Sequence, residues 1–374
     1  MLPYGRQSIS EDDIEAVAAI LRGDWLTTGP TVTAFEEAIA EVVGGHRAVS
    51  CTSGTAALHM AYAAAGVGPG DQVVTTPMTF VATASGASIL GAEVVFADVE
   101  EDTALLDPAA VDAVVTDRTK VIAAVDYAGH AADYDALQPI ADRVGALTLD
   151  DAAHSVGGTY KGRPVGDLAD ITTLSFFPTK NLTTGEGGAA VFKDDALAQR
   201  AHEFHFIGLV RDPSRWAITD EGPWHQEVHE FGINYRLTDV ASALGLSQLA
   251  RLQAFKERRT EITARYNAAL SGVDGLRTPT QRADVDPAWH LYPVRVLDGR
   301  RREVFEKMRE RGIGVQVNYI PVYWHPVYAD LGYRRGMCPN AEAFYAEELS
   351  LPLFPDLTDA QVDQVVETLI DVLG

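Results

Sequence analysis

Short apolar runs alternate with helical periods through the first half of the chain. Strands that alternate with helices in this way indicate an α/β sheet that is mainly parallel. The predicted strands are residues 48–51, 72–76, 94–97, 121–125, 146–149 and 171–176. Ligands of such sheets bind at the carboxyl ends of the strands, so the turns after these runs are the first places to search for chemistry.

The N-terminal residues predict helices with a loop between them. Ser10 precedes three acidic residues and an apolar period that begins at Ile14, which indicates an N-capped helix with an acidic first turn. Residues 24–30 (DWLTTGP) predict a loop, and a second helix follows through Phe35 and Ile39.

The pattern changes after about residue 240. Residues 239–270 predict one long helix, and further elements follow it as strand, helix, strand and helix, at residues 290–296, 302–311, 314–319 and 359–373. We therefore expect a large α/β domain, residues 1–245, and a smaller C-terminal α+β domain, residues 246–374.

Composition and charge narrow the class of protein. Of the 374 residues, 47% are hydrophobic and 22% charged, as in folded globular proteins. The net charge of -23 repels a phosphate backbone, so nucleic acid is not the expected partner. The two cysteines fit a reducing cytoplasm, and neither a signal peptide nor an apolar run of membrane-spanning length is evident. The sequence predicts a cytoplasmic protein without membrane segments.

The first candidate site lies at Ser53, Gly54 and Thr55, between a predicted strand and a predicted helix. Free backbone N–H groups and the positive end of the helix dipole suit a phosphate there. Gly54 allows an anion to approach the main chain, and the two hydroxyls add donors. Simple helix capping by the same residues is the alternative.

The second candidate is the acidic pair Asp150–Asp151, with His154 three residues later. A carboxylate at the end of a strand can hold a protonated ring nitrogen, bind a metal or act as a base. Metal binding is not expected, because further ligands at suitable spacing are not evident. For His154, an ordinary hydrogen-bonded core histidine is the alternative.

The third candidate is Lys180, which follows the predicted strand 171–176 and precedes the glycine-rich residues 185–188. A lysine kept partly desolvated becomes the neutral amine that attacks a carbonyl. A surface lysine is the ordinary alternative. The glycine-rich residues fit either a tight hairpin turn or a substrate loop.

These elements in this order resemble the fold-type-I enzymes that use pyridoxal 5'-phosphate. More narrowly, four stretches are similar to the DegT/StrS-type sugar aminotransferases: residues 76–83 (TPMTFVAT), 151–154 (DAAH), 175–180 (SFFPTK) and 232–236 (GINYR). Within that family the likeness is closest to the C4 aminotransferases of pseudaminic-acid biosynthesis. It is carried by residues 3–8, 24–30, 208–213, 288–292 and 319–326. Phe177 departs from the histidine expected in many relatives, which bears on the substrate.

The resemblance implies a large domain with a central, mostly parallel, seven-stranded sheet. It also implies a role for each candidate residue. Lys180 would carry the cofactor, and Asp151 would pair with its pyridine nitrogen. The other implied cofactor contacts are Ser53, Gly54, Thr55, Phe80, His154 and Ser175, together with Asn234, which would reach the phosphate in a neighbouring subunit of a homodimer.

The reaction implied by the resemblance transfers an amino group from L-glutamate to a nucleotide-linked keto sugar. A UDP-linked 4-keto-6-deoxy-N-acetylhexosamine is the favoured acceptor. Arg236 is the candidate for the donor carboxylate, since a guanidinium binds carboxylate in a fork, although a structural ion pair at a subunit contact is nearly as good an explanation. Trp25, Tyr319 and His325 are candidates for the sugar, or for packing at the subunit interface.

Three rival interpretations remain at this point. The first keeps the fold and takes a dTDP-linked keto sugar, aminated at C3 or C4. The second is a sugar dehydratase on the same scaffold, in which relatives replace the lysine by histidine, so Lys180 argues against it. The third is a non-catalytic regulatory protein, which predicts loss of Lys180 or Asp151.

Overall fold

The central feature of the computed structural model, which describes residues 1–218 and 220–374, is a seven-stranded sheet. Its order is β1 (Arg47–Cys51), β9 (Gly188–Phe192), β8 (Ile171–Ser175), β5 (Leu147–Asp151), β4 (Thr119–Val125), β2 (Gln72–Thr75) and β3 (Glu93–Phe96). Strand β9 runs in the opposite direction to the other six strands of this sheet. The six predicted strands are confirmed to within two residues at each end, and so is the predicted fold class.

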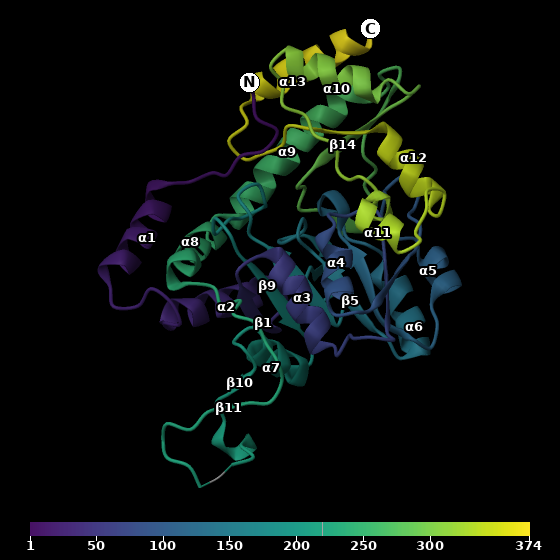
Figure 1. Ribbon diagram of the computed structural model, residues 1–374. Helices are drawn as coiled ribbons and strands as arrows, with labels where there is room; N and C mark the ends of the chain where they lie inside the picture. The colour runs from purple at the N-terminus through teal and green to yellow at the C-terminus, as the bar shows by residue number, and fades with distance from the viewer. Residues whose placement is uncertain (219) are drawn as a thin grey trace.

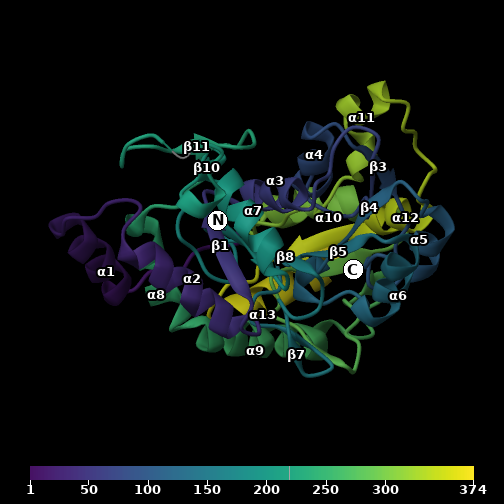
Figure 2. The same cartoon turned by 90° about the horizontal axis from the view of Figure 1, so that it is seen from below.

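Helices cover both faces of this sheet (Figure 2). One face packs against α3 (Gly54–Ala64), α4 (Ala82–Ile89) and α7 (Asp195–Phe204). The other packs against α2 (Pro30–Val42), α5 (Pro108–Val114) and α6 (Tyr134–Val144). Neighbouring strand residues therefore enter different cores: Val73 packs in the first and Val74 in the second.

The predicted helix over residues 239–270 is wrong as a single element. The structure has α8 (Asp239–Leu249) and α9 (Leu252–Leu270), with a break at Ala250 and Arg251. Arg251 reaches from this break to Asp13 of α1 (Glu11–Arg22), with 3.0 Å between Nη1 and Oδ2. Asp13 is fully buried, and it also closes the predicted N-cap of α1 by accepting from the backbone N–H of Ser10 at 2.9 Å.

The C-terminal part forms a second layer above the large sheet (Figure 1). Its three-stranded sheet has the order β12 (Leu276–Arg277), β14 (Tyr292–Val296) and β15 (Glu348–Leu351). The helices of this part are α10 (Arg301–Glu310), α11 (Pro326–Asp330), α12 (Pro339–Glu347) and α13 (Asp359–Leu373). The start of the chain joins this layer, because Leu2 forms a bridge with Ile313. The proposed boundary at residue 245 falls inside α8 and stays a prediction.

The predicted strand at residues 314–319 is wrong. This segment makes one isolated bridge, between Gln316 and Ser350 of β15, and then leaves the sheet. Asn318 donates its backbone N–H to the Glu348 carboxylate at 2.6 Å. This buried side chain takes the place of the backbone carbonyl that a neighbouring strand would offer. The segment is thereby free to line the cavity described below.

Two short pairings complete the fold. A small sheet joins β13 (Val285–Asp286), β6 (Thr159–Tyr160) and β7 (Arg163–Pro164), which ties the two layers together. The pair β10 (Leu209–Val210) and β11 (Glu227–Val228) belongs to a segment that protrudes from the lower end of the molecule (Figure 1). In the part of the chain that the structure describes, no helix has both the length and the apolar character needed to cross a membrane.

Candidate active site

A cavity of about 500 Å³ opens at the carboxyl ends of the large sheet's strands. Ligand sites of open α/β sheets lie in this position, and the volume is in the range of small-molecule pockets. It brings together nine of the residues singled out from the sequence: Ser53, Gly54, Thr55, Phe80, Asp151, His154, Ser175, Lys180 and Tyr319.

Lys180 enters this cavity from the connection between β8 and β9. Its backbone N–H donates to the Phe177 carbonyl at 2.9 Å, so a tight turn carries the side chain. The side chain is only partly shielded because it projects into the open space. Burial by the cavity walls lowers the pKa of the amine to about 8, although the nearby Asp151 carboxylate acts in the opposite direction. A substantial neutral fraction of this amine is therefore present near neutral pH.

Asp151 ends β5 and faces the same cavity. Its side chain is 5% exposed and accepts a hydrogen bond from the Thr83 hydroxyl at 2.6 Å. Burial raises the pKa of this carboxyl, while the Thr83 hydrogen bond and the Lys180 charge oppose the rise. A cationic group bound in the cavity would offset the cost of burying the carboxylate. This is the environment that a protonated pyridine nitrogen requires.

Asp150, the neighbouring carboxyl group, lies on the opposite face of the strand because side chains alternate along β5. It is fully buried, and within residues 1–218 and 220–374 neither of its oxygens has a hydrogen-bond partner. Burial, together with the nearby Asp126, raises its pKa well above the ordinary value. Of the two aspartates, Asp151 is therefore the one placed to act in the cavity.

The predicted phosphate cradle sits at the N-terminus of α3. Ser53 caps this helix, since its hydroxyl accepts from the backbone N–H of Ala56 at 3.1 Å. Both predicted roles are compatible, because a hydroxyl that accepts one hydrogen bond can still donate another. A β-carbon at Gly54 would lie 2.8 Å from that of Ser175, so only glycine leaves room between the helix and the end of β8.

His154 lies across the cavity floor. Its Nε2 is 3.2 Å from the hydroxyl of Tyr319, and its ring packs on His290 with 4.4 Å between ring centroids. Burial lowers the pKa of His154 well below its ordinary value, with a further contribution from Lys180. Its Nδ1 is buried and has no partner among the described residues, so a neutral, polar ring faces the space where a cofactor would lie.

Phe80 stands at the mouth of the cavity and is 59% exposed. Its ring makes an edge contact with Tyr319, at 6.2 Å between centroids. An exposed aromatic face over this cavity is suited to stacking on a flat heterocycle.

Four predicted residues do not line the cavity within the described part of this single chain: Trp25, Asn234, Arg236 and His325. Asn234 is exposed and lies opposite Phe206 in an isolated bridge. Arg236 packs over the Phe206 ring at 4.1 Å. The roles given to these residues depend on a second subunit and stay proposals.

Several cavity residues were not identified from the sequence. Thr83 binds Asp151, and Asn181 donates to the carbonyls of His154 at 3.1 Å and Ala288 at 2.8 Å. Tyr4 and His290 line the wall. Thr83 and Asn181 lie in or beside the motifs of the resemblance, and Tyr4 and His290 lie in stretches 3–8 and 288–292, which also carry it. No local pattern indicated, however, that these distant segments would meet here.

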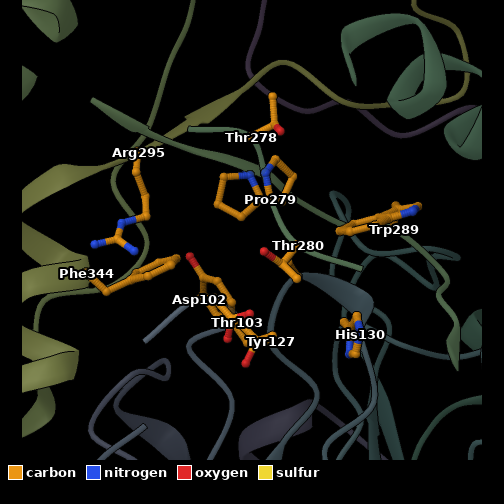
Figure 3. Close-up of a pocket in the computed structure, with 12 residues that line it drawn as sticks. Asp102, Thr103, Tyr127, His130, Thr278, Pro279, Thr280, Trp289, Arg295 and Phe344 are labelled. Carbon is orange, nitrogen blue, oxygen red and sulfur yellow. The ribbon is translucent and has the colours of Figure 1, made fainter. Parts of the chain in front are cut away.

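A second cavity lies between the two layers and is much smaller, about 20 Å³ (Figure 3). Arg295 and Phe344 stand on one side of it and Trp289 on the other. Its volume is close to that of one water molecule, so it cannot admit a coenzyme. The larger cavity is the one that fits pyridoxal phosphate: a partly desolvated lysine, a buried carboxylate, an orphaned imidazole nitrogen and a glycine-lined helix N-terminus meet there.

Comparisons with known proteins identify the family of the chain. The model of the DegT/DnrJ/EryC1/StrS aminotransferase family matches residues 7–370. The spore coat polysaccharide biosynthesis protein SpsC of Bacillus subtilis is 40% identical, over 100% of this chain and 97% of the relative.

Solved structures of sugar aminotransferases share the fold. Spr1654 of Streptococcus pneumoniae, a candidate sugar aminotransferase, superposes in its PLP form with a TM-score of 0.93 at 30% identity, covering 100% of this chain and 98% of that one. PseC of Helicobacter pylori, an aminotransferase involved in the biosynthesis of pseudaminic acid, superposes with a TM-score of 0.92 at 28% identity, covering 100% and 99%. The cofactor is pyridoxal phosphate, and the chain belongs to the DegT/DnrJ/EryC1/StrS aminotransferase family.

Proposed function

We propose that this sugar aminotransferase transfers an amino group from L-glutamate to a UDP-linked 4-keto-6-deoxy-N-acetylhexosamine. The observation that carries the chemistry is the meeting of Lys180, with a pKa lowered to about 8, and the buried Asp151 in one cavity. The likeness to PseC and to the motifs of the pseudaminic-acid enzymes supports the choice of sugar.

Each residue has a defined task in this proposal. When bound, pyridoxal phosphate supplies an electron sink for the carbanion formed at the donor's α-carbon. Asp151 holds the proton on the pyridine nitrogen. The Lys180 amine would anchor the coenzyme in the resting enzyme. Once freed, it would take the proton from the donor's α-carbon and deliver it to the coenzyme within the first half of the cycle, and it would move a proton in the reverse direction when the keto sugar is aminated. Ser53, Gly54, Thr55 and Ser175 hold the phosphate, Phe80 stacks on the ring, and His154 lies beside it.

The remaining assignments place substrates at the mouth of the cavity in a homodimer. Asn234 would reach the phosphate in the partner subunit, and Arg236 would bind the donor carboxylate in a bidentate fork. Trp25, Tyr319 and His325 would contact the sugar. The enzyme would act in the cytoplasm, where glutamate and nucleotide sugars are available.

Borohydride labelling tests the role of Lys180. We expect reduction to fix the coenzyme covalently to wild-type protein. The same result is expected for the control Lys193→Ala, which changes an exposed lysine directly after β9. Lys180→Ala should fold normally, remain unlabelled and lose turnover by at least roughly 1,000-fold. Turnover of Lys180→Ala at the wild-type rate would refute the assignment, and a wild-type protein that stays colourless with added coenzyme would favour a regulatory role.

The nucleotide and the keto position are tested with substrates. The coenzyme-loaded enzyme is incubated with L-glutamate and either UDP-linked or dTDP-linked keto sugars, and release of 2-oxoglutarate is followed. We expect the UDP-linked 4-keto sugar to give the higher kcat/KM. A preference for a dTDP-linked sugar, aminated at C3 or C4, would replace the proposed acceptor and leave the cofactor chemistry intact.

A further inference from the structure

Asp126 lies behind the site, directly after β4, and is fully buried. It does not line the cavity, so it does not touch the coenzyme or the substrates. Its backbone N–H donates to the carbonyl of Asp151 at 3.2 Å, and its carboxylate accepts from the Ser155 hydroxyl at 2.6 Å. These two hydrogen bonds hold the two ends of the short segment, residues 151–155, that carries Asp151 and His154.

The other carboxylate oxygen fixes Asp126 itself. It accepts from the backbone N–H of Ala132 and from the hydroxyl of Tyr134, each at 3.0 Å. Three donors therefore bind one carboxylate. Through it, residues 151–155 are connected to the start of α6. Such an arrangement holds its partners in a single geometry, because moving any of them leaves a buried polar group unpaired.

The raised pKa of Asp126 reflects the free-energy cost of burying a carboxylate at this position. Burial raises the pKa of Asp126 to about 7, against the lowering effect of its three hydrogen bonds, and Asp151 adds to the rise. Asp150 is also buried close by and its pKa is likewise raised. A hydrophobic residue would avoid this cost in a purely structural position, so the carboxylate is explained by what it holds.

We propose that Asp126 is a positioning residue that fastens residues 151–155 from behind the sheet and fixes Asp151 and His154 towards the coenzyme. The proposal rests on the proposed function, because it concerns the site where the coenzyme binds. It assigns no chemistry to Asp126: the bond to Ser155 holds one end of the segment that carries Asp151 and His154.

Two substitutions test this assignment. Ser155→Ala removes the hydroxyl and leaves every carboxylate in place, and Asp126→Asn keeps the shape of the side chain but replaces an acceptor oxygen with a donor. Thr148→Val is the matched control: Thr148 lies on the same strand, β5, and its buried hydroxyl also binds a carboxylate, that of Asp170 at 3.0 Å. This residue sits at the other end of the strand, away from the cavity.

The readouts are the affinity of the apo-protein for pyridoxal phosphate, followed by absorbance, and the pH at which the visible band of the bound coenzyme changes. We expect Ser155→Ala and Asp126→Asn each to weaken coenzyme binding by about 10-fold and to shift the titration of the band, whereas Thr148→Val stays within about 2-fold of wild type. In the double variant the two losses should not add, because both remove one interaction.

Wild-type coenzyme affinity and an unshifted band in Ser155→Ala would overturn the proposal. Thermal unfolding of each variant accompanies the titrations, and Ser155→Ala decides the question if Asp126→Asn does not fold. Failure of the proposed function would look different: a different sugar acceptor would leave these titrations unchanged, and failure of the proposed role of Lys180 would appear in the wild-type protein itself, as an absence of covalent label after borohydride reduction.

Discussion

In the proposed function, the protonation of a single amine, Lys180, would control how fast this protein attaches its coenzyme. Only the neutral form of an amine attacks an aldehyde, and burial lowers the pKa of Lys180 from the ordinary value to about 8. Because a lysine loses its proton as the pH rises, the neutral fraction grows roughly tenfold for each pH unit below 8 and then levels off.

We therefore expect the rate at which apo-protein attaches pyridoxal phosphate to rise up to about pH 8 and then become constant. Stopped-flow absorbance on apo-protein measures this directly. A rate that keeps rising to pH 10 would show that the amine keeps an ordinary lysine pKa. Asp151→Asn should move the plateau to lower pH, because the Asp151 charge is what raises the pKa of this amine.

Two adjacent carboxyl groups allow a controlled test of the second predicted residue. Asp151→Asn should leave the coenzyme bound but slow turnover by roughly 100- to 10,000-fold, since an amide does not keep the pyridine nitrogen protonated. Asp150→Asn is the matched control. Burial already favours the neutral form of Asp150, and that residue faces away from the cavity, so its variant should stay within about 3-fold of wild type. Steady-state kinetics with glutamate would contradict the assignment if the two variants lost activity equally.

At the scale of elements, α3 closely approaches the end of β8 at the proposed phosphate cradle. Gly54→Ala would place a β-carbon 2.8 Å from the β-carbon of Ser175, so the N-terminus of α3 and the end of β8 would have to move apart. We expect coenzyme affinity to fall by about 10- to 100-fold, with a smaller change in thermal stability. The control is Gly68→Ala, where an added β-carbon meets no atom within 4 Å. Equal affinities for the two variants in a coenzyme titration would mean that the phosphate binds elsewhere.

The elements that the sequence predicted well are those whose signal is local. Six strands of the large sheet were apparent as short apolar runs because both faces of this sheet are buried. Strand β9 was missed, since Gly188 and two alanines follow other glycines and resemble a turn. The helix break at Ala250 and the irregular path of residues 314–319 were also missed, because Asp13 and Glu348 cause them from far along the chain.

The residues of the candidate site were likewise predicted where their signal is local and missed where it depends on distant segments. Ser53, Asp151 and Lys180 lie at or shortly after the end of a strand, so the rule that ligands bind at strand ends located them. Asp126 also follows a strand, but its function depends on Ser155 and Tyr134, which have no distinctive spacing from it. His290 reaches the cavity from the C-terminal layer. Only the folded arrangement shows such contacts.

At the scale of the whole molecule, the protruding segment around β10 and β11 leaves several large apolar side chains exposed. Phe231 is 99% exposed, and Trp224 and Val228 are also exposed. Asn234 and Arg236 leave this segment close to the phosphate cradle, because the Thr52 backbone N–H donates to the Tyr235 carbonyl at 2.9 Å. Apolar groups exposed beside predicted ligands support the proposal that a second copy of the chain covers this surface.

If the active site is shared between subunits, two inactive variants should complement each other when they form mixed dimers. Lys180→Ala removes the anchoring amine, and Asn234→Ala removes the residue proposed to enter the partner's cavity. If both are nearly inactive alone, unfolding and refolding them together in equal amounts should restore about a quarter of the wild-type sites. Half of the dimers are then mixed, and one of the two sites in each mixed dimer is intact. The measurement is specific activity after refolding, with each variant refolded alone as the control. If Asn234 served only its own subunit, every site in the mixture would keep one lesion, and activity would stay at the level of the separate variants.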